Sequence, residues 1–129
     1  MKDIEVAGLT TLKVSQDGTS FRMGVRTREG REAALVFPSE SLKSLLIDLF
    51  RASDTAFKRQ LDDNNVKLVY PIDDFALQAA VEDDRLILTL RTHDGFDASF
   101  ALEPNTLVVM ASMARMHMEA TNEDAQTVH

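Results

Sequence analysis

The chain contains no cysteine and no tryptophan, and only 6% of its 129 residues are aromatic. The absence of cysteine excludes disulfides, thiolate nucleophiles and thiolate metal ligands. The sequence also lacks an apolar run of about 18 residues, the length that a membrane-spanning helix needs. Its first residues include Asp3 and Glu5 and no apolar stretch. We therefore expect no signal peptide, no contact with a membrane and a cytoplasmic location.

Positive charge is scarce as well. Fourteen Lys and Arg stand against 21 Asp and Glu, which gives a formal net charge of -7. The basic residues are scattered, whereas direct binding to a nucleic acid backbone needs clustered Lys and Arg. Hydrophobic residues make up 44% and charged residues 27% of the chain, a composition typical of folded globular proteins. We expect a single domain over residues 1–129 that does not bind nucleic acid directly.

Motifs for catalysis, cofactors and metals are missing. The five glycines are dispersed, and none forms a phosphate-binding GxGxxG or Walker loop. No GxSxG element surrounds a serine. Among the histidines, only His93 adjoins a carboxylate, Asp94, whereas a metal site needs three or four converging ligands. We predict no catalytic residue, no cofactor and no metal, which favours a non-catalytic protein without settling whether the chain is an enzyme.

The two halves of the sequence resemble each other at an offset of 65 residues. The identical pairs are Lys2 and Lys67, Leu12 and Leu77, Arg26 and Arg91, Thr27 and Thr92, Gly30 and Gly95, Ala33 and Ala98, and Leu42 and Leu107. This offset predicts two pseudo-repeats, at about residues 2–62 and 66–120. The polar residues 121–129 are expected to form a flexible tail.

One hairpin register explains both halves. If Gly30 and Gly95 each end a three-residue loop in the left-handed conformation, every apolar strand residue falls on one face. The predicted pairs are Phe21 with Phe37, Met23 with Leu35, Val25 with Ala33, Leu86 with Leu102, Leu88 with Phe100 and Leu90 with Ala98. A preceding strand pairs Val14 with Phe21 and Leu12 with Met23 across Asp17-Gly18, and Ala79 with Leu86 and Leu77 with Leu88 in the second half.

A helix follows each set of strands. Apolar residues at helical spacing start after Pro38 and again after Pro104. The segments 4–6 and 66–70 add one further strand ahead of each set. The fold class is therefore α+β, with two tandem antiparallel strand-meander-plus-helix repeats (β-β-β-β-α twice) and the helices packed on one face of the sheet.

Arg26 and Arg91 occupy the same place in the two repeats and are candidates for an anion or ligand site. The predicted register offers a structural role instead, because it places Arg26 opposite Glu32 and Arg91 opposite Asp97. Cross-strand pairs of opposite charge stabilise sheets. We favour the structural role and keep the ligand site as an alternative.

The second helix carries apolar residues on two sides. At about 100° per residue, Leu107, Met110 and Met118 share one side. Val109, Met113 and Met116 fall on the opposite side and form the candidate interface. Methionine is flexible and suits protein-binding surfaces, and the same stripe on two chains is self-complementary about a twofold axis. The helix could instead be enclosed on both sides within its own chain.

These observations favour a small protein-interaction or adaptor module that acts as a homodimer, bound to itself or to another protein. A weaker candidate surface is the outer face of the sheet, formed by Gly24, Ala34, Val36, Ile87, Thr89 and Ala101. One alternative is a small-molecule enzyme or ligand-binding protein with a site between the two repeats. A second alternative is an acidic inhibitor of a nucleic-acid-binding partner, which would gather its carboxylates on one face.

Overall fold

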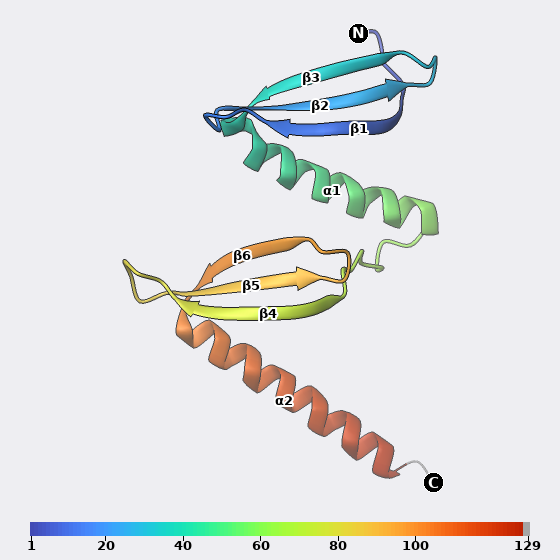
Figure 1. Ribbon diagram of the computed structural model, residues 1–129. Coiled ribbons are helices and arrows are strands. Elements are labelled where there is room, and N and C mark those ends of the chain that lie inside the picture. Colours follow the sequence, from blue (N-terminus) through green and yellow to red (C-terminus); the bar gives the residue numbers. More distant parts are fainter. Residues whose placement is uncertain (128–129) are drawn as a thin grey trace. The chain divides into compact units, whose positions relative to one another are not determined.

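The computed structural model describes residues 1–127, with side-chain burial for residues 1–122. The chain divides into two compact units, Met1–Leu68 and Val69–His129, here called unit 1 and unit 2. Unit 1 consists of β1 (Val6–Val14), β2 (Ser20–Thr27), β3 (Glu32–Pro38), a short 3₁₀ turn η1 (Ser39–Ser41) and α1 (Leu42–Leu61). Unit 2 consists of β4 (Ile72–Ala79), β5 (Leu86–Thr92), β6 (Asp97–Leu102) and α2 (Pro104–Thr127) (Figure 1).

Each unit contains a three-stranded antiparallel sheet with its strands in sequence order, β1-β2-β3 in sheet 1 and β4-β5-β6 in sheet 2. All the cross-strand pairs predicted from the sequence are present, from Val14 with Phe21 to Leu90 with Ala98. The predicted register is therefore confirmed in both units. Because side chains alternate between the two faces of a strand, this register places the apolar residues on one face of each sheet.

Glycine closes the second hairpin of each unit. Gly30 has φ 87° and Gly95 has φ 85°, as the predicted loops need. The amide of Thr27 donates to the carbonyl of Arg31, and the amide of Thr92 donates to the carbonyl of Phe96 in the same way. The two loops therefore have the same structure, and in both of them the glycine adopts the left-handed conformation on which the predicted register depends.

Each unit has three strands, and the predicted fourth strand of each repeat is wrong. Residues 4 and 5 lie outside any strand, and Val6 already belongs to β1. In β1, register shifts fall between Val6 and Gly8 and between Leu9 and Thr11. A β-bulge inserts an extra residue and interrupts the alternation, so one bulged strand has the sequence pattern of two.

The predicted strand at residues 66–70 is absent for a different reason. The amide of Leu68 donates to the carboxylate of Asp54 in α1, at 3.4 Å. The segment then reaches Pro71, which has no amide hydrogen to give to a strand pair. Residues 66–70 therefore connect α1 to β4 without joining a sheet.

The two helices begin and end at recognisable signals. α1 ends at Leu61, and the residue that caps it, Asp62, has a φ of 50°, in the left-handed region typical of helix C-termini. α2 begins with Pro104, a residue favoured at the first helical position because it has no amide hydrogen to leave unpaired. α2 continues to Thr127, so residues 121–127 extend the helix, while residues 128 and 129 of the predicted tail lie outside the described residues.

Burial is confined to the centre of sheet 1. Phe21 and Val25 of β2 are the buried apolar residues of the described chain, with 5% and 3% of their surface exposed. The rings of Phe21 and Phe37 stack with centroids 4.9 Å apart. No residue of α1 is buried, and within residues 104–122 of α2 only Leu107 is even half-buried. Within the described residues neither helix contains a buried side chain, so the predicted packing of the two helices on one face of the sheet is not confirmed.

Candidate interaction surface

The helix α2 is exposed on both of its apolar sides. Met113 and Met116, on the side predicted as an interface, are 54% and 68% exposed. Met110 and Met118, on the side predicted to face the core, are 48% and 67% exposed. Val109 is exposed as well. The two sides thus differ little, because α2 leads away from the end of β6 and most of its length lies clear of sheet 2 (Figure 1).

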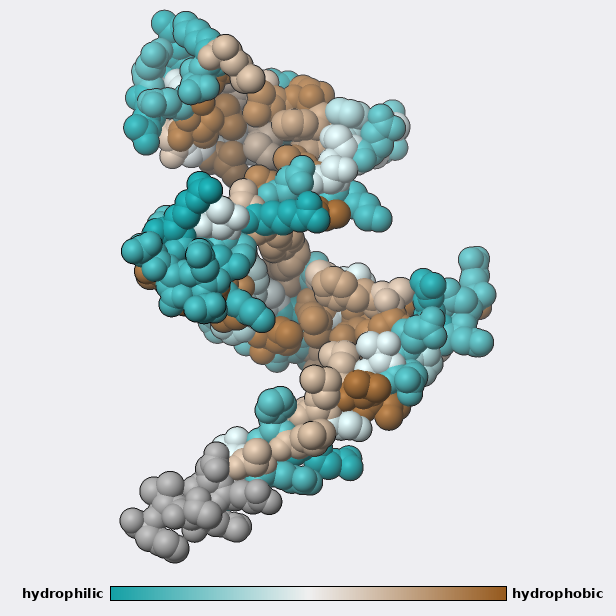
Figure 2. Space-filling view, turned by 180° about the vertical axis from the view of Figure 1, so that it is seen from behind, coloured by the Kyte–Doolittle hydropathy of each residue, from teal (hydrophilic) through white to brown (hydrophobic). Residues whose placement is uncertain are grey.

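The apolar face of sheet 2 is also open to solvent. Phe75 of β4 is 68% exposed and Phe100 of β6 is 53% exposed. The described part of unit 2 contains no buried side chain at all. Figure 2 shows hydrophobic surface, in brown, reaching the solvent. A chain of about 60 residues normally buries about 60% of the surface of its unfolded state, so unit 2 lacks the core that would hold it folded by itself.

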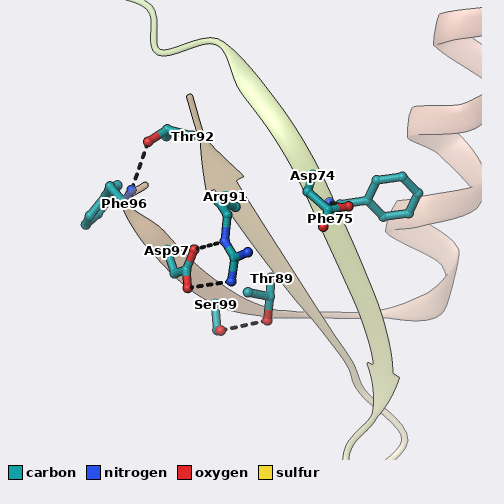
Figure 3. A network of polar contacts seen from close by, with 8 residues as sticks. All are labelled: Asp74, Phe75, Thr89, Arg91, Thr92, Phe96, Asp97 and Ser99. Carbon is teal, nitrogen blue, oxygen red and sulfur yellow. Dashed lines mark hydrogen bonds and ion pairs between the residues drawn. The ribbon is translucent and has the colours of Figure 1, made fainter. Parts of the chain in front are cut away.

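Arg91 is held by Asp97 on the other face of sheet 2 (Figure 3). Its Nε donates to one carboxylate oxygen of Asp97 at 2.8 Å, and its Nη2 donates to the other at 3.3 Å. The hydrogen bond from Arg91, with the charge of that guanidinium, lowers the pKa of Asp97, and the same partner raises the pKa of Arg91. Thr89 and Ser99 share a hydrogen bond beside this pair. The guanidinium thus already has a bidentate anionic partner.

Arg26, the equivalent of Arg91 in unit 1, lies opposite Glu32 as the register predicts. Both residues are in the described part of the chain, and they make no ion pair, unlike Arg91 and Asp97. On the same face of sheet 1, the hydroxyls of Thr10 and Thr11 lie over Gly24. The anion site at Arg26 and Arg91 stays a prediction, and the structural role has direct support at Arg91 alone.

Carboxylates lie at both ends of sheet 2. One end carries Asp73, Asp74, Asp94 and Asp97, and the other carries Glu82, Asp83, Asp84 and Glu103. At the first end, Nδ1 of His93 lies 3.2 Å from Asp73, a partner that the sequence did not indicate. In the part of the chain that the structure describes, no group of three His, Asp or Glu side chains could hold a metal ion. The carboxylates in and around the strands of sheet 2 are therefore divided between its two ends.

The division of charge between the units was not recognised from the sequence. Unit 1 contains eleven Lys and Arg and ten Asp and Glu, a formal charge of +1, whereas unit 2 contains three and eleven, a formal charge of -8. The whole-chain value of -7 hides this difference. Counting the charges of the two repeats separately would have revealed it.

Comparison with family models, with curated proteins and with solved structures gives no match for this chain. Within the described residues, no helix is both long and apolar enough to cross a membrane.

Proposed function

We propose that the protein is a non-catalytic protein-interaction module that acts as a homodimer, with the apolar sides of α2 as its main contact surface. The observation that carries the proposal is the exposure of α2, where Val109, Met113 and Met116 lie open to solvent together with the opposite side of the helix. A helix with two apolar sides gains stability only when both are covered. Its flexible methionines can adapt to the surface that covers them.

Self-association is the simplest way to cover such a helix, because the same stripe on two copies is self-complementary about a twofold axis. Exposed apolar patches larger than a few hundred Å² are rare on soluble monomers and mark binding sites. The occupied guanidinium of Arg91 supports this proposal over a ligand site, because a bound anion would have to displace Asp97.

The test is a charged double substitution, Met113→Glu with Met116→Lys, followed by light scattering after size exclusion over a concentration series. Buried charges oppose association strongly, so we expect at least a tenfold rise in the dissociation constant. The matched control is Arg115→Glu with Glu119→Lys, which also leaves the net charge unchanged but alters exposed polar residues of α2. If the methionine variant keeps both the mass and the thermal stability of the unmodified chain, α2 is not an interface.

A further inference from the structure

The polar face of sheet 1 carries three positive charges and one carboxylate. Lys13 of β1 lies directly opposite Arg22 of β2, and Arg26 lies on the same face of β2. Like charges directly opposite each other destabilise a sheet. Within the described residues, none of these three cations forms an ion pair, although the carboxylate of Glu32 lies across from Arg26. This face therefore keeps unneutralised positive charge at a cost in stability.

Two threonine hydroxyls meet in the middle of the same face. Neighbouring residues of a regular strand point to opposite faces, but a bulge between Leu9 and Thr11 interrupts β1. Oγ1 of Thr10 and Oγ1 of Thr11 therefore both lie over Gly24, 2.6 and 2.5 Å from the point that a Cβ atom would occupy. Within the described residues, neither hydroxyl has a hydrogen-bond partner. The missing side chain of Gly24 thus leaves room for two unpaired hydroxyl groups.

A hollow of about 360 Å³ lies over these hydroxyls, and its lining includes Thr10, Thr11, Arg22, Gly24 and Glu32. Thr10 also lines a second hollow, of about 270 Å³, together with Arg26. Arg22 and Arg26 each stand two residues from Gly24, so their Cα atoms lie roughly 6.6 Å from its Cα atom. An extended arginine side chain spans that distance. Two guanidinium groups and two hydroxyls can therefore direct their donors to one place above Gly24.

The corresponding face of sheet 2 lacks these features and serves as an internal comparison. Its residues at the positions of Lys13, Arg22 and Gly24 are Gln78, Ile87 and Thr89. Its one arginine, Arg91, is held by Asp97 at 2.8 Å, and the hollow beside this pair has a volume of only about 60 Å³. The same strand register is thus built without uncompensated charge, so the fold itself does not require the cations of sheet 1.

We infer that the polar face of sheet 1 binds the phosphate group of a small ligand, above Gly24 and between Arg22 and Arg26. Guanidinium groups bind phosphate through paired, charge-assisted hydrogen bonds, and the ammonium group of Lys13 adds a third positive charge. These groups and the two hydroxyls offer more donors than the two oxygens of a carboxylate can accept. The net charge of -7 opposes a long polyanion, which favours a small ligand.

Glu32 gives this phosphate site a second kind of contact. Its carboxylate lines the hollow beside Arg22 and can accept a hydrogen bond from a hydroxyl or amino group of the same ligand. Towards inorganic phosphate, which brings only negative charge to this carboxylate, Glu32 is repulsive. The site lies within unit 1 and does not rest on the proposed dimer.

The test is a titration of the full-length protein with inorganic phosphate, followed through its amide NMR signals. A parallel titration with potassium chloride at the same ionic strength measures the effect of screening alone. We expect saturable shifts centred on Thr10, Thr11 and Gly24 with phosphate and none with chloride. Glu32→Gln should lower the dissociation constant for inorganic phosphate, because it removes the repelling charge from the hollow.

Two variants with the same change of charge locate the site. Arg26→Gln should raise the dissociation constant at least tenfold, because hydrogen bonds between charged groups are strong. Arg91→Gln removes the same charge from the equivalent position of unit 2 and should leave the dissociation constant unchanged, because Asp97 already holds Arg91.

Lys13→Gln separates binding from folding. It introduces the residue that unit 2 has at this position, Gln78, and removes the like charge opposite Arg22. Its urea midpoint in the absence of phosphate should therefore equal or exceed that of the unmodified chain, while its dissociation constant for phosphate rises. Weaker binding by this variant cannot be attributed to unfolding.

Three results would overturn the inference. Shifts with phosphate that match those with chloride mean that no site exists. Equal weakening by Arg26→Gln and Arg91→Gln means that phosphate responds to net charge or to a site shared by the two repeats. Unchanged binding by Arg26→Gln means that phosphate binds elsewhere. None of these results bears on self-association, which the methionine variant tests separately.

Discussion

The close approach of β1 to β2 at Gly24 allows a stability prediction with an internal control. A Cβ atom at position 24 would lie 2.5 Å from Oγ1 of Thr11 and 2.6 Å from Oγ1 of Thr10. Both distances are far shorter than a van der Waals contact, so the threonine side chains or the strand must move. The same substitution at Gly8, also in β1, meets no atom within 4 Å.

The expected magnitude follows from two opposing effects. Overpacking costs about 1–3 kcal/mol, while replacing glycine by alanine at a compatible site stabilises by about 0.4–1 kcal/mol through the unfolded state. We therefore expect Gly24→Ala to lower the free energy of unfolding by about 1–2 kcal/mol. Gly8→Ala should be neutral or slightly stabilising.

Urea denaturation of both variants, followed by circular dichroism at one fixed protein concentration, measures the difference. Because a dimer makes stability depend on concentration, the concentration must not vary between variants. With an m value of about 2 kcal/mol/M, the midpoint of Gly24→Ala should fall by roughly 0.5–1 M. In a background with Thr10→Ala and Thr11→Ala the loss should shrink, because the clashing atoms are gone. A Gly24→Ala midpoint equal to or above that of Gly8→Ala would refute the packing described at this position.

Two further predictions concern charged groups. Hydrogen bonds from Ser15 and Thr19 lower the pKa of Asp17 to about 2, so the carboxylate stabilises the fold above about pH 4, and this contribution is lost as the pH falls towards 2. A carbon-13 NMR titration should give a midpoint near 2, and a midpoint near 4 would show that these hydrogen bonds are absent in solution. The ion pair of Arg91 with Asp97 should give a measurable, salt-sensitive coupling in a double-mutant cycle, whereas the equivalent cycle of Arg26 with Glu32 should give almost none. Equal couplings in the two cycles would contradict the difference between the two units.

The sheet registers were predictable because two local signals agree. Alternation places Phe21, Met23 and Val25 on one face, and Gly30 fixes the loop length that keeps Ala33 on the same face. A slip by one residue would have divided the apolar face, so only one register was compatible with burial. The same reasoning at Gly95 gave the register of β5 and β6.

The number of strands was not predictable in the same way. The bulge between Leu9 and Thr11 places Leu9 and Leu12 on one face although they are three residues apart. Alternation alone cannot represent an inserted residue, and therefore it divided β1 into two strands. Nothing local distinguishes residues 66–70 from a strand either, because their connection to α1 depends on the distant carboxylate of Asp54.

The surfaces that pack against α2 could not be predicted from local sequence patterns either. The sequence of α2 shows that the helix has two apolar sides, but it does not show which surface covers each side. The helix spacing of Leu107, Met110 and Met118 suggested a core-facing side, yet Met110 and Met118 are about as exposed as Met113 and Met116. Such a choice depends on surfaces far away in the sequence or in a second chain. The candidate interface residues are thus placed at an exposed site, and their partner remains a proposal.

In the proposed homodimer, a second copy of the chain covers the open apolar surfaces of unit 2. Light scattering after size exclusion, over a concentration series of the unmodified protein, tests this most directly. We expect a mass twice that of the 14.4 kDa chain, falling towards the single-chain mass on dilution. A constant 14.4 kDa across the series, with the amides of β4, β5 and β6 protected from hydrogen exchange, would contradict it, because unit 2 would then be stable without a second copy.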